Sequence, residues 1–213
     1  MARCARAIAL VGLICAGAAS AQDAVSYRVE VALDWKASEA GPDNPHWSRL
    51  IAVAHSGRYD LFADGDTASS GLALVATNGR VSVLRAELAE VQRRRRAGEI
   101  VELPGIATGV GRFAFDIALT DRFDQVSFAT MLAPSPDWFT GVSGVDLKPE
   151  DVWLDQVSVA LWPWDAGADS GPDFEGPNVP TQPRQSVRLL THPAFLTEDG
   201  MRPIGRATFS RRP

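Results

Sequence analysis

Pro134-Ser135-Pro136-Asp137-Trp138-Phe139 is the stretch from which the fold of this chain is best approached, and a second turn-rich stretch follows at 162–171. The second stretch reads Trp162-Pro163-Trp164-Asp165-Ala166-Gly167-Ala168-Asp169-Ser170-Gly171. The two loops carry three aspartates, Asp137, Asp165 and Asp169, and a strand pattern lies between them. Carboxylates crowded at loop ends repel one another unless a cation or a proton relieves the repulsion. The pattern therefore indicates a shared site at the ends of β-strands.

Three interpretations of these aspartates follow from the residues. Their hard oxygen ligands suit calcium, which accepts roughly six to eight oxygens in flexible geometry. Asp165 and Asp169 lie in one five-residue loop around Gly167, which folds both toward a single point. Alternatively, Asp137 and Asp165 cap turns through Asx hydrogen bonds, or they form the carboxylate pair that glycoside hydrolysis requires. The spacing favours one calcium ion, and the other two interpretations stay open.

The first residues are typical of a targeting segment. Arg3 and Arg6 give a positive start, an apolar small-residue run follows at 7–18, and Ala19-Ser20-Ala21 is an A-x-A cleavage site. The run is too short and too rich in Ala and Gly to remain as a spanning helix. We therefore predict a signal peptide at 1–21 and a secreted or periplasmic mature domain at 22–213, with no transmembrane segment.

Cysteine usage and charge exclude several classes of function. Cys4 and Cys15 both fall in the predicted signal peptide, so the mature chain is expected to lack disulfides, zinc–thiolate sites and cysteine nucleophiles. Removing Arg3 and Arg6 changes the formal net charge from −5 to −7. This acidic balance argues against nucleic acid as a partner, because its phosphates demand a basic face. About 190 residues are ample for one core, and we expect a single domain.

The hydrophobic pattern beyond the signal peptide predicts an antiparallel β-sandwich, an all-β fold with one short helix. Alternating or continuous apolar runs predict strands at Ser26–Trp35, Leu50–His55, Tyr59–Phe62, Ile100–Leu103, Phe113–Leu119, Gln125–Leu132, Val152–Leu161, Val187–Thr191 and Arg206–Phe209. An apolar stripe with a period near 3.6 predicts the helix at Val81–Ala97, ended by Gly98. Ala68–Gly71 is expected to form a tight turn into Leu72–Val75.

Two further patterns need an explanation. Arg93–Arg96 is a run of four arginines at the end of the predicted helix. Favourable interaction with the helix dipole is the simpler explanation of this run, and binding of an anionic partner is the more specific alternative. Gly109-Val110-Gly111-Arg112-Phe113-Ala114 fits a loose dinucleotide fingerprint, but a strand follows it where the fingerprint requires a helix. No local catalytic motif surrounds His46, His55 or His192, although a triad assembled in space stays open.

These residues also resemble a known family, the spondin domain of F-spondin and mindin. The resemblance covers nearly all of the expected mature chain and lies in short matching segments, which are His46-Trp47-Ser48, His55-Ser56, Tyr59-Asp60-Leu61-Phe62-Ala63-Asp64-Gly65, Ala68-Ser69-Ser70-Gly71, Val126-Ser127-Phe128, Pro134–Phe139 with Gly141-Val142, Trp164–Gly167, Asp169–Gly171, Pro177-Asn178 and Thr181-Gln182-Pro183.

The resemblance implies a β-sandwich similar to calcium-dependent membrane-targeting domains, with one calcium ion at its edge. Its ligands would be Asp137, Asp165 and Asp169, with Asp116 at the position of the acidic residue in the family's Phe-acid-Val strand. Animal members are extracellular matrix proteins that carry disulfides and further repeats. This chain looks like a stand-alone bacterial-type member, so the resemblance implies a fold and a cation site and names no partner.

We therefore expect a calcium-binding adhesion or recognition module without catalytic activity, whose partner is an unidentified protein, glycan or lipid at the cell envelope. Phe139 is expected to be exposed beside the calcium loops and to contact that partner. One alternative is a metal-assisted hydrolase of envelope glycans or phosphoesters, with Asp116 as the base. Another is a carbohydrate-binding module that stacks sugars on Trp138, Trp162 or Trp164.

Overall fold

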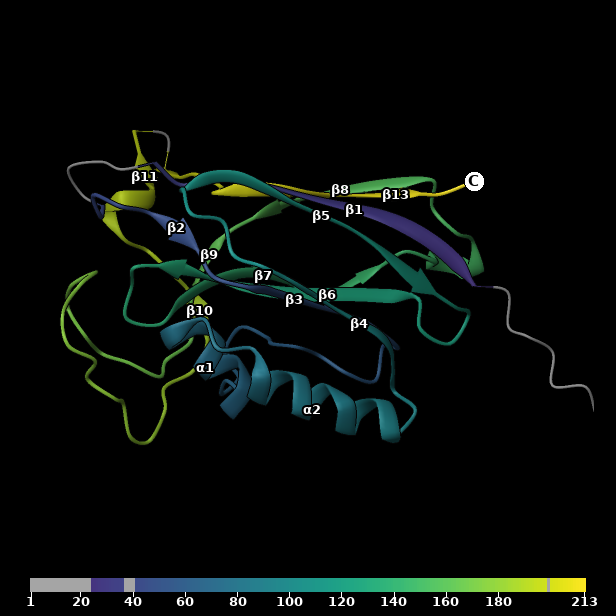
Figure 1. The fold of residues 1–213 in the computed structure, drawn as a ribbon, viewed down its shortest axis with the longest axis horizontal. Helices are drawn as coiled ribbons and strands as arrows, with labels where there is room; N and C mark the ends of the chain where they lie inside the picture. Colours follow the sequence, from purple (N-terminus) through teal and green to yellow (C-terminus); the bar gives the residue numbers. More distant parts are fainter. Residues whose placement is uncertain (1–23, 37–40, 199) are drawn as a thin grey trace, which may run out of the picture.

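The computed structural model describes residues 24–36, 41–198 and 200–213. The predicted signal peptide therefore lies outside the described residues. Within them, the strands form two large antiparallel sheets and one small hairpin (Figure 1).

The smaller of the two large sheets has the strand order β5-β1-β13-β8. Its strands are β5 (Val110–Leu119), β1 (Val25–Asp34), β13 (Gly205–Arg211) and β8 (Gln156–Leu161). Alternation in β1 places Val29 and Val31 in the core and leaves Arg28 and Glu30 on the outer face. One face of this sheet packs on the core and the other faces outward, as the period-two pattern of its sequence predicts.

The larger sheet has the order β10-β9-β7-β6-β3-β4, and β2 pairs with β6 beside it. These strands are β2 (His46–Trp47), β3 (Leu50–His55), β4 (Ala97–Leu103), β6 (Gln125–Ala133), β7 (Trp138–Asp146), β9 (Pro163–Asp165) and β10 (Arg188–Leu189). The small hairpin consists of β11 (Leu196–Thr197) and β12 (Gly200–Met201), and short 3₁₀ turns lie at Pro149–Asp151 and Pro193–Phe195. The predicted antiparallel β-sandwich is confirmed.

Two helices cover the outer face of the larger sheet (Figure 1), namely α1 (Ser70–Asn78) and α2 (Ser82–Arg93). Strand β3 is consequently buried on both faces. Leu50, Ala52 and Ala54 pack in the core between the sheets, whereas Ile51 and Val53 pack in a second core beneath the helices. Burial on both faces explains why the sequence of β3 is continuously apolar.

The prediction of a single helix at Val81–Ala97 is wrong in number and extent. Helix α1 occupies the segment expected to be a turn followed by Leu72–Val75, and Ser69 caps it because its hydroxyl oxygen accepts the Leu72 N–H at 3.1 Å. Helix α2 ends at Arg93, and Gly98 lies inside β4. Residues 59–62, predicted to form a strand, form none.

Strand β7 has no counterpart among the predicted strands, although it directly follows the first aspartate loop. Its sequence includes Gly141 and Gly144, which weaken an apolar alternation. Gly141 is required by packing, since a Cβ there would overlap the carbonyl oxygen of Phe128 on β6. The close approach of β6 and β7 therefore fixes the loop that carries Asp137.

Candidate functional site

The pairing of β7 with β9 brings the two aspartate loops together. Trp138, the first residue of β7, is the register partner of Asp165, the last residue of β9. Asp137 immediately precedes β7, and its carbonyl oxygen accepts the Ala166 N–H at 3.2 Å. Asp169 follows four residues after Asp165 in the loop that leaves β9. The predicted convergence of the two loops is therefore present.

Asp137 is completely buried. Its Oδ2 accepts backbone N–H groups from Ala168 at 2.6 Å and Asp169 at 3.0 Å. Its Oδ1 is buried and has no hydrogen-bond partner among the described residues. Burial first, and then the nearby carboxylate of Asp165, raise the pKa of Asp137 to about 6 against the opposing effect of the two N–H donors. Asp137 thus carries one buried oxygen that the surrounding protein leaves unsatisfied.

Asp165 is nearly buried and its carboxylate is paired. Its Oδ1 accepts the Gly167 N–H at 2.7 Å. Its Oδ2 accepts two hydrogen bonds from the Arg188 guanidinium group, one from Nη2 at 2.7 Å and one from Nε at 3.1 Å. Arg188 reaches it because β10 pairs with β9 in a register that places Arg188 opposite Asp165. Sequence reasoning missed this arginine, which lies more than twenty residues away in the chain.

Asp169 ties two parts of the loop region together. Its Oδ1 accepts N–H groups from Gly171 at 2.8 Å and Val179 at 2.9 Å. Turn capping therefore describes Asp165, whose Oδ1 accepts from the residue two positions later, and Asp169 does the same, whereas the bonds of Asp137 run to the other loop. Oδ1 of Asp137 is the buried carboxylate oxygen of the three that has no partner among the described residues. Among the described residues, no group of three or more His, Cys, Asp or Glu side chains is arranged to hold a metal ion as it stands.

Asp116 lies apart from the other three aspartates. It occupies the outer face of β5 in the smaller sheet, as its place opposite Phe115 and Ile117 in the alternation predicts. Its carboxylate is half exposed and pairs with Arg28 at 3.5 Å and Arg212 at 3.3 Å. Asp116 and Arg28 are cross-strand register partners. We therefore explain Asp116 by these ion pairs and leave it out of the candidate site.

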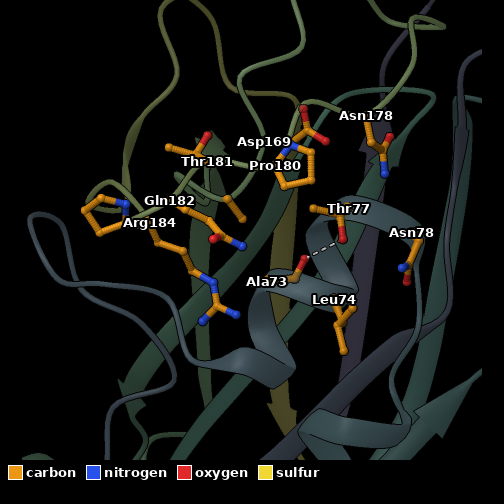
Figure 2. A pocket seen from close by; sticks show the side chains of 12 residues that line it. Ala73, Leu74, Thr77, Asn78, Asp169, Asn178, Pro180, Thr181, Gln182 and Arg184 are labelled. Atoms are coloured by element: carbon orange, nitrogen blue, oxygen red, sulfur yellow. Dashed lines mark hydrogen bonds between the residues drawn. The ribbon is translucent and has the colours of Figure 1, made fainter.

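Two cavities adjoin the aspartate loops. One of about 280 Å³ is lined by Asp165, Asp169, Arg188 and neighbouring residues. A larger one, of about 530 Å³, lies between α1 and the segment 178–184 (Figure 2). Its lining side chains are mostly amides, hydroxyls, prolines and one arginine, and the carboxylate of Asp169 lies at its edge. No sequence pattern indicates this cavity, because one of its walls is α1, whose segment is expected to form a turn.

A hydrogen-bonded histidine and serine occur elsewhere, but their surroundings do not form a catalytic triad. His55 Nε2 lies 2.6 Å from Ser127 Oγ, and both residues are completely buried. His55 Nδ1 lies 3.0 Å from the carbonyl oxygen of Ser56, where a triad would place a carboxylate. Ser127 Oγ also accepts the Gly144 N–H at 2.8 Å. These hydrogen bonds satisfy the polar atoms of both side chains, so the two residues are explained as parts of the buried core.

The expected exposure of Phe139 is wrong. Phe139 points into the core beneath the helices, where its ring packs edge-on against Phe62 at 5.0 Å. Trp138 is nearly buried, and the ring of Trp164 packs against Phe62 at 5.4 Å. The aromatic residues beside the aspartates therefore anchor the loops to the two cores. Trp138 presents no open stacking face, whereas Trp162 and Trp164 are half-buried.

Comparison with known proteins decides the family, since a family model described as Spondin_N matches residues 25–199. The chain belongs to the Spondin_N family. Human Spondin-2 is 33% identical over 175 residues, which are 78% of this chain and 53% of Spondin-2. Spondin-1 of Gallus gallus is 34% identical over 182 residues, which are 78% of this chain and 22% of that protein. Spondin-1 of Xenopus laevis is 32% identical over 208 residues.

The family resemblance seen in the sequence motifs is thus confirmed, and the match includes both aspartate loops of this Spondin_N chain. The chain spans about half the length of Spondin-2 and about a fifth of the length of Gallus gallus Spondin-1. Within the described residues, no helix has the length and apolar character needed to cross a membrane.

Proposed function

We propose that this Spondin_N domain is a calcium-binding adhesion or recognition module, secreted or periplasmic, that has no catalytic activity. The observation that carries the proposal is Oδ1 of Asp137, a completely buried carboxylate oxygen without a hydrogen-bond partner in the described structure. An unpaired buried charge is costly, and native proteins retain one chiefly where an ion or a proton compensates it. Two further carboxylates on the adjoining loop supply the remaining negative charge.

The donor set suits a hard cation. Calcium would be held by Oδ1 of Asp137, by Asp169 and by Asp165, with main-chain carbonyl groups of the Asp165 loop and water completing the shell. Arg188 now occupies Oδ2 of Asp165, but its side chain is 61% exposed and can turn into solvent at little cost. Calcium would supply the positive charge that Asp137 lacks, and it would fix the loop after β9 against the loop before β7.

Recognition would follow from the shape of the fixed loop. Asp169 lies at the edge of the larger cavity, so an ion that orders Asp169 also orders one wall of that cavity (Figure 2). The opposite wall is α1, which is held by the core beneath the helices. A protein, glycan or lipid at the cell envelope would contact this region. The relatives named spondins support placement outside the cytoplasm, and they identify no partner for this chain.

The two alternatives receive less support. A metal-assisted hydrolase needs a base beside the ion, and Asp116, the expected base, pairs with arginines on the other sheet. A carbohydrate-binding module needs an open aromatic face, and of its three expected platforms Trp138 is nearly buried while Trp162 and Trp164 are half-buried. We therefore keep the non-catalytic module as the proposed function.

The test is the thermal stability of the purified protein without metal and with added calcium or magnesium, beside Asp137→Asn. We expect calcium to raise the Tm selectively, with a stabilisation of about 2.7 kcal/mol when calcium exceeds its Kd a hundredfold. Asp137→Asn should show no calcium response, because the ligand charge is lost. In metal-free buffer the variant should be at least as stable as the native chain, because it no longer buries that charge.

Asp116→Asn is the matched control, since it makes the same change of charge at an exposed aspartate. We expect it to keep the full calcium response. Absence of any calcium response in the native chain would reduce the three aspartates to turn caps. A response lost in Asp116→Asn and kept in Asp137→Asn would place the ion elsewhere in the domain.

A further inference from the structure

Three connecting segments meet at one end of the larger sheet, the end at which α2 terminates (Figure 1). The sheet register brings them together. His55, the last residue of β3, pairs with Ala97 at the start of β4 and with Gln125 at the start of β6. The residues just beyond these pairs, namely 56–58, 94–96 and 121–122, are therefore neighbours. Two backbone-directed bonds join them, from the Ser56 N–H to the Arg96 carbonyl at 3.0 Å and from Arg122 Nε to the Arg95 carbonyl at 3.1 Å.

A cavity of about 420 Å³ opens between these segments, and three arginines line it. Arg58, Arg95 and Arg122 come one from each segment, and Ser56 and Asp121 complete the lining. None of the three arginines forms an ion pair within the part of the chain that the structure describes. The carboxylate of Asp121 is bound by Nζ of Lys148 at 2.9 Å. Lys148 Nζ also binds Asp151. Three guanidinium groups without an ion-pair partner, and the single carboxylate of Asp121, thus line one concave site on a chain of negative net charge.

The four arginines at 93–96 divide into two pairs that have different surroundings. Arg93 and Arg94 both pair with Glu90 on the preceding turn of α2, a contact that the helix-dipole account of the run did not include. Arg95 instead lines the cavity, and Arg96 immediately precedes β4. Ion pairing on the helix therefore explains only the first half of the run.

The backbone at Arg95 supplies an independent observation. The Arg95 N–H donates to Gln92 O at 2.8 Å and the Arg96 N–H donates to Val91 O at 3.1 Å, which is the hydrogen-bond pattern of a Schellman motif. Arg95 occupies the left-handed position of that motif with φ 55°. Glycine is the usual residue there, because a side chain is disfavoured in this conformation. An arginine kept at a position that favours glycine points to a function of its side chain.

We propose that this arginine cavity binds a phosphate or sulfate ester group of a soluble ligand. Guanidinium groups present paired N–H donors that match the oxygens of such groups, and several arginines around one concavity are a common way to bind them. Ser56 adds a hydroxyl at the cavity wall. The proposal is independent of calcium, since none of the cavity residues belongs to the aspartate loops.

The test is titration of the purified protein with inorganic phosphate and with inorganic sulfate at low ionic strength, followed by calorimetry or NMR shifts. We expect saturable binding at one site and a loss of affinity of at least tenfold in Arg95→Gly. The Tm of Arg95→Gly should equal or exceed that of the native chain, because glycine suits the left-handed position. Arg58→Gln should lose affinity similarly, and it leaves the Arg95 backbone and its hydrogen bond from Arg122 in place.

Arg206→Gln is the control, because it removes the same charge from an exposed arginine on β13 of the other sheet. It should leave the affinity within about twofold of the native value. Equal weakening in Arg95→Gly and Arg206→Gln would overturn the proposal in favour of general charge attraction, as would unchanged binding in Arg95→Gly. Binding to phosphatidylglycerol vesicles without binding to free phosphate or sulfate would also overturn it, by assigning the arginines to a membrane surface.

Discussion

His55 shows how one side chain can be fixed in a single protonation state by its neighbours. Its Nδ1 lies beside a carbonyl oxygen and must donate, so its Nε2 accepts from the hydroxyl of Ser127. Ser127 in turn accepts the Gly144 N–H. Burial, the largest effect, lowers the pKa of His55 from its ordinary value of 6.5. The neutral imidazole is therefore the form that the core accommodates.

The contribution of His55 to the stability of the domain should consequently fall as the pH decreases below about 6.5. In that window the unfolded chain binds a proton at this histidine while the folded chain does not, so protonation favours unfolding. Urea unfolding at pH 7.5, 6.5 and 5.5 would measure the effect beside His55→Gln. The stability advantage of the native chain over the variant should shrink with each step toward lower pH.

The stability of His55→Gln should still depend on pH, because burial also lowers the pKa of His192 and raises the pKa of Asp137, two shifts whose effects on stability are opposite in sign. A stability advantage that is constant over the three pH values would show that His55 titrates alike in the folded and unfolded states. At this scale the alternation of Phe113–Leu119 in the sequence is sufficient to place Asp116 away from the core. The sequence could not predict Arg188, because a two-residue strand supplies that contact from a distant part of the chain.

The contact between α1 and α2 sets two opposing effects against each other at Gly71. Alanine there would raise the intrinsic helix propensity by about 1 kcal/mol. However, a Cβ at this position would overlap the Cα of Leu84 on α2 and approach the Glu87 carboxylate to 2.5 Å. That carboxylate accepts the Gly71 N–H at 2.8 Å and the Ser69 hydroxyl at 2.7 Å, so it helps to cap α1.

We therefore expect Gly71→Ala to destabilise the domain by about 1–3 kcal/mol, because overpacking against backbone outweighs propensity. The midpoint of urea denaturation would measure the change. Ser69→Ala is a useful comparison, since it removes the cap without adding volume and should cost about 1 kcal/mol. A stabilised Gly71→Ala variant would mean that the two helices separate readily.

The helical layer also shows where sequence patterns are insufficient. Leu72-Ala73-Leu74-Val75 is a short apolar run, and periodicity alone does not distinguish a buried helix from a strand. Helix α2 was predicted because one of its faces meets solvent and its apolar stripe is clear. Strand β7 was missed because its glycines serve close packing against β6, a relation that only the folded sheet reveals.

For the whole molecule, the sequence predicted the sandwich and the convergence of the aspartate loops, because alternation and loop motifs are local. It did not predict that helices form a third layer on the larger sheet, and so it missed the cavity beside α1 and misplaced Phe139. That layer depends on residues of both faces of β3 and β6. Phe128 packs between the sheets while its neighbour Ala129 packs beneath the helices.

Because β3 and β6 contribute to both cores, the helices and the sandwich should unfold as one cooperative unit. Leu84, a completely buried residue of α2, touches only the core beneath the helices. Leu84→Ala should cost about 2–5 kcal/mol and should lower a single transition. Far-UV circular dichroism reports the helices. Tryptophan fluorescence in a Trp164→Phe background reports the core between the sheets through Trp35 and Trp47, since Trp164 itself packs against the core beneath the helices. The two signals should keep one common Tm in the native chain and in the variant.

If the helical signal of the variant were lost at a lower temperature than the tryptophan signal, the helical layer would be a separable unit and the shared strands would not couple the two cores.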